Sequence, residues 1–231
     1  LGKAARISDA SGRYIEFCKS SLKRNINFNN LKIVLDVANG AAYDVAPKVF
    51  KELGAEIIVL SDKPDGININ KNCGSTDIKL LQKEVIKNKA DFGIAFDGDG
   101  DRLIFVDENA IELNGDDILY VLARDKFENQ ITLGSKGIVG TIMTNKGLEI
   151  SLAKMGVDLI RTDVGDRHVL QKLEELNWDL GGEQSGHIIS LDSSNSGDAI
   201  IAAIKFLEAY VCSDLPLKEL LNPLVKYPQI L

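Results

Sequence analysis

The chain has 231 residues, of which 45% are hydrophobic and 26% are charged, and its net charge is −7. This composition is typical of a globular protein long enough for one large core or two modest ones. The net negative charge argues against negatively charged partners, so we expect neither nucleic acid nor an anionic membrane surface to bind. No apolar run approaches the roughly 20 residues that a membrane span requires.

The cysteines and the N-terminus bear on the compartment. Cys18, Cys73 and Cys212 form no closely spaced pair, which argues against a zinc site or a disulfide framework. Residues 1–6 lack the apolar stretch of a signal peptide, so we expect a reducing, cytoplasmic compartment. Because the first residue is Leu1 rather than methionine, we also expect the chain to be a piece of a longer protein.

The first half of the chain is predicted to contain an N-terminal helix over residues 1–25 and then a strand–helix–strand unit. The apolar run 33–38 suits a buried strand, and segment 45–53 places its apolar residues at helical spacing. Gly54 follows where a left-handed helix end is expected, and the run 55–60 predicts a second strand. Two strands joined through a helix in this way are expected to be parallel.

The second half repeats this order. A strand is predicted at 138–143, a helix then ends at Gly156, and another strand follows at 157–160. The repeat predicts two similar three-layer α/β/α domains with mixed, mainly parallel sheets. We place them at residues 1–108 and 109–231, each within the usual size range of a domain.

Both halves then continue alike. In the first half, Ser75 or Thr76 is expected to cap a helix, and the strand 92–96 leads into an acidic loop. In the second half, a helix begins after Asp166, and a short strand at 178–180 leads into a glycine-rich loop. These two loops carry the chemistry that the sequence predicts.

The acidic loop contains Asp97, Asp99 and Asp101, separated by single glycines and followed by Arg102. The glycines let the backbone curl, so that all three carboxylates can converge. Converging carboxylates repel one another unless a cation lies among them, and oxygen ligands favour Mg²⁺, Mn²⁺ or Ca²⁺ over zinc. We therefore predict one bound Mg²⁺ ion, with Arg102 beside it as a bidentate donor to a phosphate.

Three other interpretations of the acidic loop stay open. An EF-hand has the same spacing and a glutamate at position twelve, here Glu108. It also requires glycine at position six, where Arg102 stands, and helices on both sides, where strands are predicted. A solvated acidic turn needs no ion, and a sugar phosphatase would use Asp97 as a covalent nucleophile.

The glycine-rich loop, residues 181–187, offers an acceptor, a hydroxyl and an imidazole at alternate positions, in Glu183, Ser185 and His187. This arrangement suits the hydroxyl groups of a sugar. His187 is a candidate general acid or base, or a donor to phosphate, and a structural histidine fits the sequence nearly as well.

A third polar loop, residues 164–168, contains Gly165, Asp166 and Arg167 between a strand and a helix. Arg167 at a helix N-terminus is able to hold a phosphate together with backbone N–H groups. A plain surface helix start explains the same residues equally well.

Taken together, these segments resemble the phosphohexomutase superfamily, and the combination of the acidic loop with the 181–187 loop resembles its phosphoglucosamine mutases. The resemblance covers nearly the whole chain. Its matching stretches are residues 36–42, 63–70, 73–76, 97–102, 164–167 and 181–187.

The resemblance implies an isomerase of four domains, of which this chain supplies domains II and III. Such enzymes interconvert glucosamine 6-phosphate and glucosamine 1-phosphate through a phosphoserine and a 1,6-bisphosphate, in the synthesis of bacterial cell-wall precursors. By resemblance, Asp97, Asp99 and Asp101 hold Mg²⁺ and Arg102 contacts the phosphoserine. Glu183 and Ser185 match residues that hold sugar hydroxyls.

The chain departs from the family pattern in two places. The Ser-His-Asn-type loop that carries the phosphoserine and the arginine-rich Ser-Gly-Thr phosphate loop are both missing. We therefore expect this chain alone to be inactive and to need the missing N- and C-terminal domains as partners. Specificity for glucosamine phosphates over glucose or mannose phosphates, as in phosphoglucomutases and phosphomannomutases, stays open, as does the oligomeric state.

Overall fold

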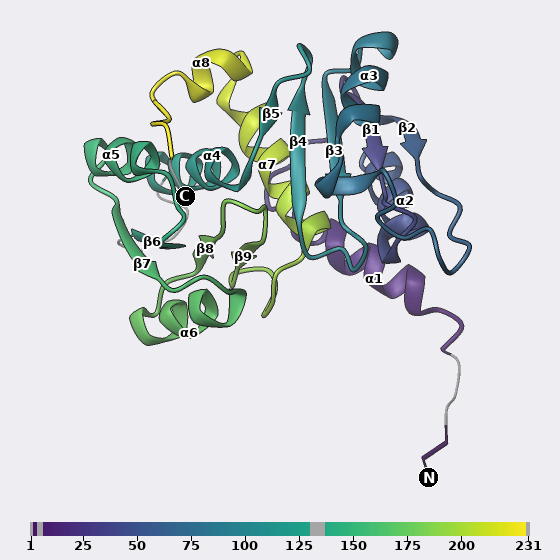
Figure 1. The fold of residues 1–231 in the computed structure, drawn as a ribbon, viewed down its shortest axis with the longest axis horizontal. Coiled ribbons are helices and arrows are strands. Elements are labelled where there is room, and N and C mark those ends of the chain that lie inside the picture. The colour runs from purple at the N-terminus through teal and green to yellow at the C-terminus, as the bar shows by residue number, and fades with distance from the viewer. Residues whose placement is uncertain (1, 4–6, 130–136, 230–231) are drawn as a thin grey trace.

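The computed structural model describes residues 2–3, 7–129 and 137–229. The two halves of the chain form two sheets, each with helices on both faces, in neighbouring lobes (Figure 1). The predicted fold class, two three-layer α/β/α domains with mixed sheets, is confirmed. Within the ranges described, no helix has both the length and the apolar character to cross a membrane.

The first sheet has the strand order β2-β1-β3-β4-β5. Strand β1 pairs in parallel with β2 and β3, whereas β3–β4 and β4–β5 are antiparallel pairs. The strands are β1 (Lys32–Asp36), β2 (Glu56–Leu60), β3 (Phe92–Phe96), β4 (Leu103–Asp107) and β5 (Glu112–Leu113).

Alternating apolar residues explain why helices cover both faces of this sheet. Val34 of β1 packs with Leu81 and Val85 of α3 on one face, while Ile33 and Leu35 belong to the core cluster on the other face. Helices α1 and α2 lie on that second face. The helical segments here are α1 (Ala10–Lys19), η1 (Ala41–Tyr43), α2 (Val45–Glu52), η2 (Gly74–Thr76) and α3 (Lys79–Asn88).

Two local predictions in this half need correction. Ser75 and Thr76 do not cap α3, because they form the separate 3₁₀ turn η2, and Ile78 precedes α3 without a side-chain cap. The N-terminal helix is also shorter than predicted, because α1 begins only at Ala10 and ends at Lys19.

The second sheet has the order β7-β6-β8-β9 and repeats the plan of the first. Strand β6 pairs in parallel with β7 and β8, and β8 pairs antiparallel with β9. The hairpin β8–β9 therefore corresponds to the hairpin β3–β4, and the predicted repeat is confirmed. The strands are β6 (Gly137–Thr141), β7 (Asp158–Thr162), β8 (Leu180–Gly182) and β9 (Ile188–Ser190).

Helix α6 covers one face of the second sheet, where Val169 and Leu173 pack on Val139. The other face meets α4, α5 and α7. The first sheet ends at Leu113 and α4 begins at Gly115, a few residues after the boundary predicted at 108. The helices are α4 (Gly115–Glu128), α5 (Lys146–Lys154), α6 (Asp166–Leu176), α7 (Ala199–Ser213) and α8 (Leu217–Leu221).

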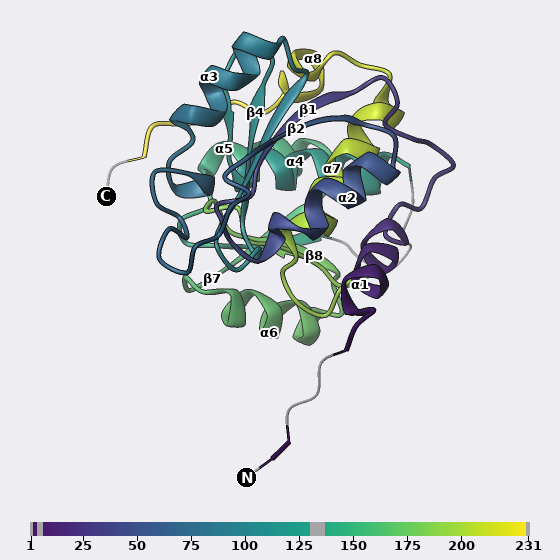
Figure 2. The same ribbon diagram turned by 90° about the vertical axis from the view of Figure 1, so that its right-hand side faces the viewer.

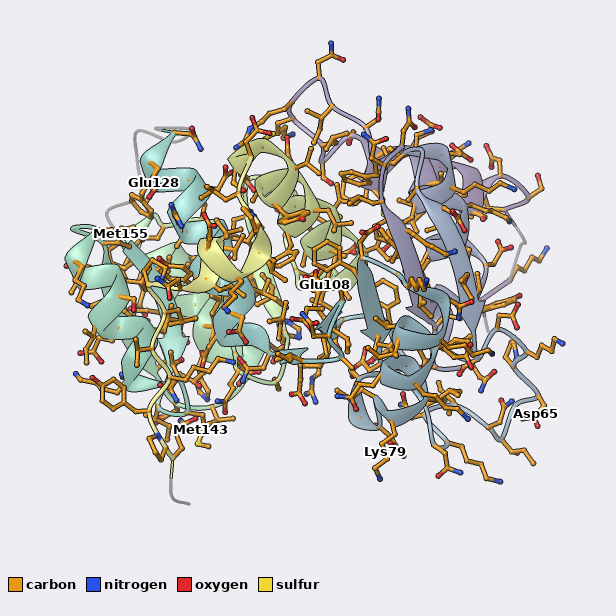
Figure 3. The ribbon with its side chains drawn as sticks, turned by 90° about the horizontal axis from the view of Figure 1, so that it is seen from above. Asp65, Lys79, Glu108, Glu128, Met143 and Met155 are labelled. Atoms are coloured by element: carbon orange, nitrogen blue, oxygen red, sulfur yellow. The ribbon has the colours of Figure 1, made fainter. Side chains whose placement is uncertain are left out.

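Helix α7 joins the two domains. Figure 1 shows it between the lobes, and Figure 3 shows the same arrangement from above. Figure 2, seen from the side of the first domain, shows α2 in front of α7. Its residue Phe206 packs against Phe92 of β3 and Phe105 of β4, with ring centroids 6.1 Å and 4.2 Å away. One cluster of buried side chains therefore runs through both domains.

Candidate active site at the junction of the two domains

The acidic loop forms the connection of the β3–β4 hairpin, and its backbone curls around Asp97. One carboxylate oxygen of Asp97, Oδ1, accepts hydrogen bonds from the backbone N–H groups of Gly100, Asp101 and Arg102, at 3.1, 3.2 and 3.1 Å. Gly100 has a φ of +79°, a conformation that glycine adopts without strain. The curl turns the following carboxylates towards Asp97.

The three predicted ligands lie close enough to share a cation. One carboxylate oxygen from each of Asp97, Asp99 and Asp101 lies within 4.8 Å of the other two. Burial, together with the neighbouring carboxylates of Asp101 and Asp99, raises the pKa of Asp97 to about 6. A divalent ion bound by hard oxygen ligands would relieve this repulsion, so the donor set fits Mg²⁺. The EF-hand alternative fails because strands flank the loop.

Two other segments of the first domain, residues 36–42 and 73–76, support the acidic loop. The buried carboxylate of Asp36 accepts hydrogen bonds from the N–H groups of Ala38 (3.0 Å) and Gly74 (2.9 Å), which ties segment 36–42 to segment 73–76. The N–H of Ala41 donates to the carbonyl of Gly98 in the acidic loop at 2.8 Å. Both segments were recognised in the sequence without a chemical role, and the structure gives them a supporting one.

The glycine-rich loop forms the corresponding β8–β9 connection of the second domain, and it meets the acidic loop directly. The N–H of Leu103 donates to the carbonyl of Gly186 at 3.2 Å, and Arg102 and His187 form an isolated antiparallel bridge. Nδ1 of His187 lies 3.1 Å from Oδ2 of Asp101. The hairpin loops of the two domains therefore touch where each loop rejoins its second strand.

Glu183 connects the glycine-rich loop to the third polar loop. Its Oε1 accepts a hydrogen bond from the N–H of Gly165 at 3.0 Å, and Gly165 immediately precedes α6. Asp166 and Arg167 occupy the first two positions of α6 and are exposed. All three polar loops predicted from the sequence thus lie at one junction.

A cleft of about 570 Å³ opens beside these loops and is lined by polar and apolar residues of both domains. Among the predicted site residues, Arg102, Glu183 and Ser185 line it, and Ser75 and Thr76 of the first domain complete one wall. The side chain of Arg102 is 49% exposed, with Nε 4.0 Å from the Asp101 carboxylate, so it is free to meet a ligand.

Seven of the ten predicted site residues are not among the residues lining the cleft: Asp97, Asp99, Asp101, Gly165, Asp166, Arg167 and His187. His187 is buried between the acidic loop and Gly197 instead. Figure 3 shows Met143, which does line the cleft, on the same side of the molecule as Lys79 of the other domain.

Comparison with protein-family models decides the family. Residues 12–112 match the model for phosphoglucomutase/phosphomannomutase alpha/beta/alpha domain II, and residues 114–227 match the model for domain III. The chain belongs to the phosphoglucomutase/phosphomannomutase family.

Members of this family with curated names resemble the chain over its whole length. Phosphoglucosamine mutase of Aliivibrio fischeri (strain ATCC 700601 / ES114) is 52% identical over 231 residues, and that of Histophilus somni (strain 2336) is 51% identical. In each comparison the alignment covers 100% of this chain and 52% of the relative. The chain thus spans about half the length of the curated relatives it matches.

Solved structures of the family share the fold. A phosphoglucomutase/phosphomannomutase family protein from Burkholderia thailandensis superposes with a TM-score of 0.80 at 25% identity, covering 94% of this chain and 46% of that one. Aspergillus fumigatus N-acetylphosphoglucosamine mutase, solved in complex with GlcNAc-6P and magnesium, gives a TM-score of 0.74 at 20% identity, covering 96% and 51%.

The last described residues of this family member also reach the site, which the sequence did not predict. Asn145 holds Tyr227 through two hydrogen bonds, from Tyr227 N–H to Asn145 Oδ1 (2.9 Å) and from Asn145 Nδ2 to the carbonyl of Tyr227 (2.8 Å). Gln229 then accepts a hydrogen bond at 2.7 Å from the side chain of Gln184, which lines the cleft. In the sequence, the only indication of these contacts is that the C-terminal segment contains polar residues such as Gln229.

Proposed function

We propose that the full-length protein is a phosphoglucosamine mutase, an isomerase that interconverts glucosamine 6-phosphate and glucosamine 1-phosphate. One observation carries the proposal: the acidic loop and the loop containing Glu183 and Ser185 meet beside a cleft that both domains line. Relatives named phosphoglucosamine mutase, at 50–52% identity, support the choice of an amino sugar over glucose or mannose phosphates.

Each loop has a distinct task in this proposal. Asp97, Asp99 and Asp101 hold one Mg²⁺ ion, which when bound neutralises charge on the phosphate being transferred. Arg102, exposed towards the cleft, orients that phosphate. Glu183 and Ser185 hold sugar hydroxyls, so that the phosphorylated end of the sugar faces the acidic loop.

The phosphoryl group itself comes from outside this chain. A phosphoserine in a preceding domain transfers its phosphoryl group to the free sugar oxygen, which forms the 1,6-bisphosphate. The serine then recovers a phosphoryl group from the other oxygen, and the product is the isomer. Glucosamine 1,6-bisphosphate is thus both intermediate and activator, and this chain contributes ion binding and sugar recognition.

Three further elements of the proposal come from the sequence. We expect Gly165, Asp166 and Arg167 to assist in holding the phosphosugar, with Glu183 fixing the position of Gly165. We place the enzyme in the cytoplasm, supplying precursors for peptidoglycan. The missing N- and C-terminal domains are its necessary partners.

The proposal is tested with Asp99→Asn in the full-length protein. Asp99 is exposed, so the amide is compatible with the fold while one charged ligand of the ion is lost. We expect kcat to fall at least about 100-fold, because stabilisation of phosphoryl charge by a metal is worth several kcal/mol. The measurement is conversion of glucosamine 6-phosphate at saturating Mg²⁺.

Asp62→Asn, which removes an exposed aspartate after β2, is the matched control and should retain wild-type turnover. The 231-residue chain should show no interconversion, because it lacks the serine. Wild-type turnover by Asp99→Asn would refute the role of the acidic loop. Turnover by the 231-residue chain would refute the need for the missing domains.

A further inference from the structure

The second domain holds the acidic loop of the first domain at several points. The N–H of Ala199, the first residue of α7, donates to the carbonyl of Gly100 at 3.0 Å. The N–H of Leu103, at the other end of the loop, donates to the carbonyl of Gly186 at 3.2 Å. The loop that carries the metal ligands is therefore fastened to two elements of the neighbouring domain.

Among these contacts, that of His187 reaches a metal-ligand carboxylate. Its Nδ1 lies 3.1 Å from Oδ2 of Asp101. An ionised carboxylate accepts hydrogen bonds, so the His187 tautomer with its proton on Nδ1 donates to Asp101. The side chain of Asp101 is 33% exposed, and this imidazole is the partner that fixes its orientation.

The ring of His187 is buried and closely surrounded. The residue is 4% exposed, and Nε2 has no hydrogen-bond partner within the described part of the chain. Nε2 lies against Gly197, where a β-carbon would come within 2.2 Å of it. The ring is therefore enclosed by the second domain with only Nδ1 directed at the acidic loop.

We propose that His187 is a positioning residue that fixes the Asp101 carboxylate for metal binding, so that metal affinity depends on contact between the two domains. This inference rests on the proposed function, in which Asp101 is a ligand of the ion. A histidine that donates to a ligand carboxylate restricts its rotation before the ion arrives, and partners of this kind typically change metal affinity about 10–100-fold.

Arg102 gives a second reason why Asp101 needs this restraint. Its Nε lies 4.0 Å from Oδ1 of Asp101, close to an ion pair. Without the hydrogen bond from His187, Asp101 is free to turn towards the guanidinium. If Asp101 and Arg102 formed an ion pair, Asp101 would no longer be available to the metal. Arg102 would no longer be available to the phosphate.

The test measures Mn²⁺ affinity by electron paramagnetic resonance in the full-length protein and in its variants His187→Ala and His187→Asn. Asparagine places an amide N–H near the position of Nδ1 and keeps the donor, whereas alanine removes it. We expect His187→Ala to weaken Mn²⁺ binding about tenfold or more, and His187→Asn to restore it to within about threefold of wild type. Circular dichroism verifies that the variants are folded.

His168→Ala, which changes the exposed histidine of α6, is the matched control and should bind Mn²⁺ as the wild type does. Unchanged affinity in His187→Ala would overturn the inference while leaving the proposed function intact. Equal weakening in His187→Ala and His187→Asn would also overturn it, because the donor would then be irrelevant. Failure of the wild type to bind Mn²⁺ would instead refute the proposed metal site itself.

Discussion

Gly40 shows how closely the residues around the acidic loop are fitted together. A β-carbon at this position would lie 2.3 Å from the carbonyl oxygen of Gly98, and that oxygen belongs to the backbone and cannot turn away. Gly40→Ala should therefore displace the acidic loop and lower the free energy of unfolding by about 1–3 kcal/mol. Urea unfolding followed by circular dichroism measures the change.

Gly12→Ala provides the comparison, because a β-carbon at Gly12 in α1 meets nothing within 4 Å. This substitution should leave the free energy of unfolding unchanged or raise it by up to about 1 kcal/mol, through better helix propensity. If Gly40→Ala were equally harmless, the close contact between Gly40 and Gly98 would not exist in solution.

Residue type and spacing predicted that the three aspartates of the acidic loop converge, and the structure brings them together. Three aspartates separated by glycines indicated the acidic loop, and Glu183 and Ser185 stand in a loop that the structure places beside it. The sequence did not show how His187 is oriented, because its partner Asp101 lies in the other half of the chain. Sequence spacing carries no information about such contacts between domains.

Helix α4 is the element that sequence periodicity missed. It lies between the second sheet, α5 and α7, and its residues from Gly115 to Ala123 are all buried. A helix buried on every side shows no polar face, so no apolar stripe at helical spacing stands out. Its start was nevertheless marked in the sequence by Asn114 and Asp117, which form a capping box.

Ion pairs help to hold two helices, α4 and α7, on the second sheet. Asp192 is the carboxylate that both of them contact. It follows β9 and pairs with Lys205 of α7 at 2.8 Å and with Lys126 of α4 at 3.7 Å. Burial alone would raise the pKa of Asp192, but the two lysines outweigh it and lower the pKa to about 2.

This lowered pKa predicts how stability depends on pH. The charged form of Asp192 is favoured in the folded state, so its contribution is complete above the unfolded pKa of about 3.9 and is lost as pH falls towards 2. A lowering of about two units corresponds to about 2–3 kcal/mol. We expect Asp192→Asn to reduce the free energy of unfolding by about this amount at pH 6 and by much less at pH 2.5, measured by urea unfolding.

The exposed Asp62→Asn serves as a control and should follow the wild type at both pH values. A loss in Asp192→Asn that stayed constant between pH 6 and pH 2.5 would show that packing, rather than the ion pairs with Lys126 and Lys205, accounts for its effect.

At the scale of the whole molecule, the repeat places corresponding loops of the two domains against each other. Each domain presents the connection of its antiparallel hairpin, β3–β4 or β8–β9, and the two connections meet at Leu103 and Gly186. The sequence repeat predicted two similar domains. It did not predict that they share one core, because Phe206 and its partners Phe92 and Phe105 lie in different halves of the chain.

The shared core predicts that both domains unfold together. The single tryptophan, Trp178, packs in the second domain and reports on that domain only, whereas circular dichroism reports on both. In the wild type, we expect the two signals to give coincident urea transitions, as a single cooperative unit requires. Separate transitions would mean that the contact through α7 is too weak to couple the domains.

Phe206→Ala tests the residue on which this coupling depends. Phe206 is fully buried against Phe105 and Phe92, so truncation removes apolar contacts and leaves a cavity between the domains. The expected loss is about 3–5 kcal/mol in the free energy of unfolding. Phe17→Ala, on α1 with 42% of its side chain exposed, should lose far less. Because the cavity lies between two domains that each retain a sheet covered by helices, the Trp178 and circular dichroism transitions of Phe206→Ala should separate, while those of Phe17→Ala stay coincident.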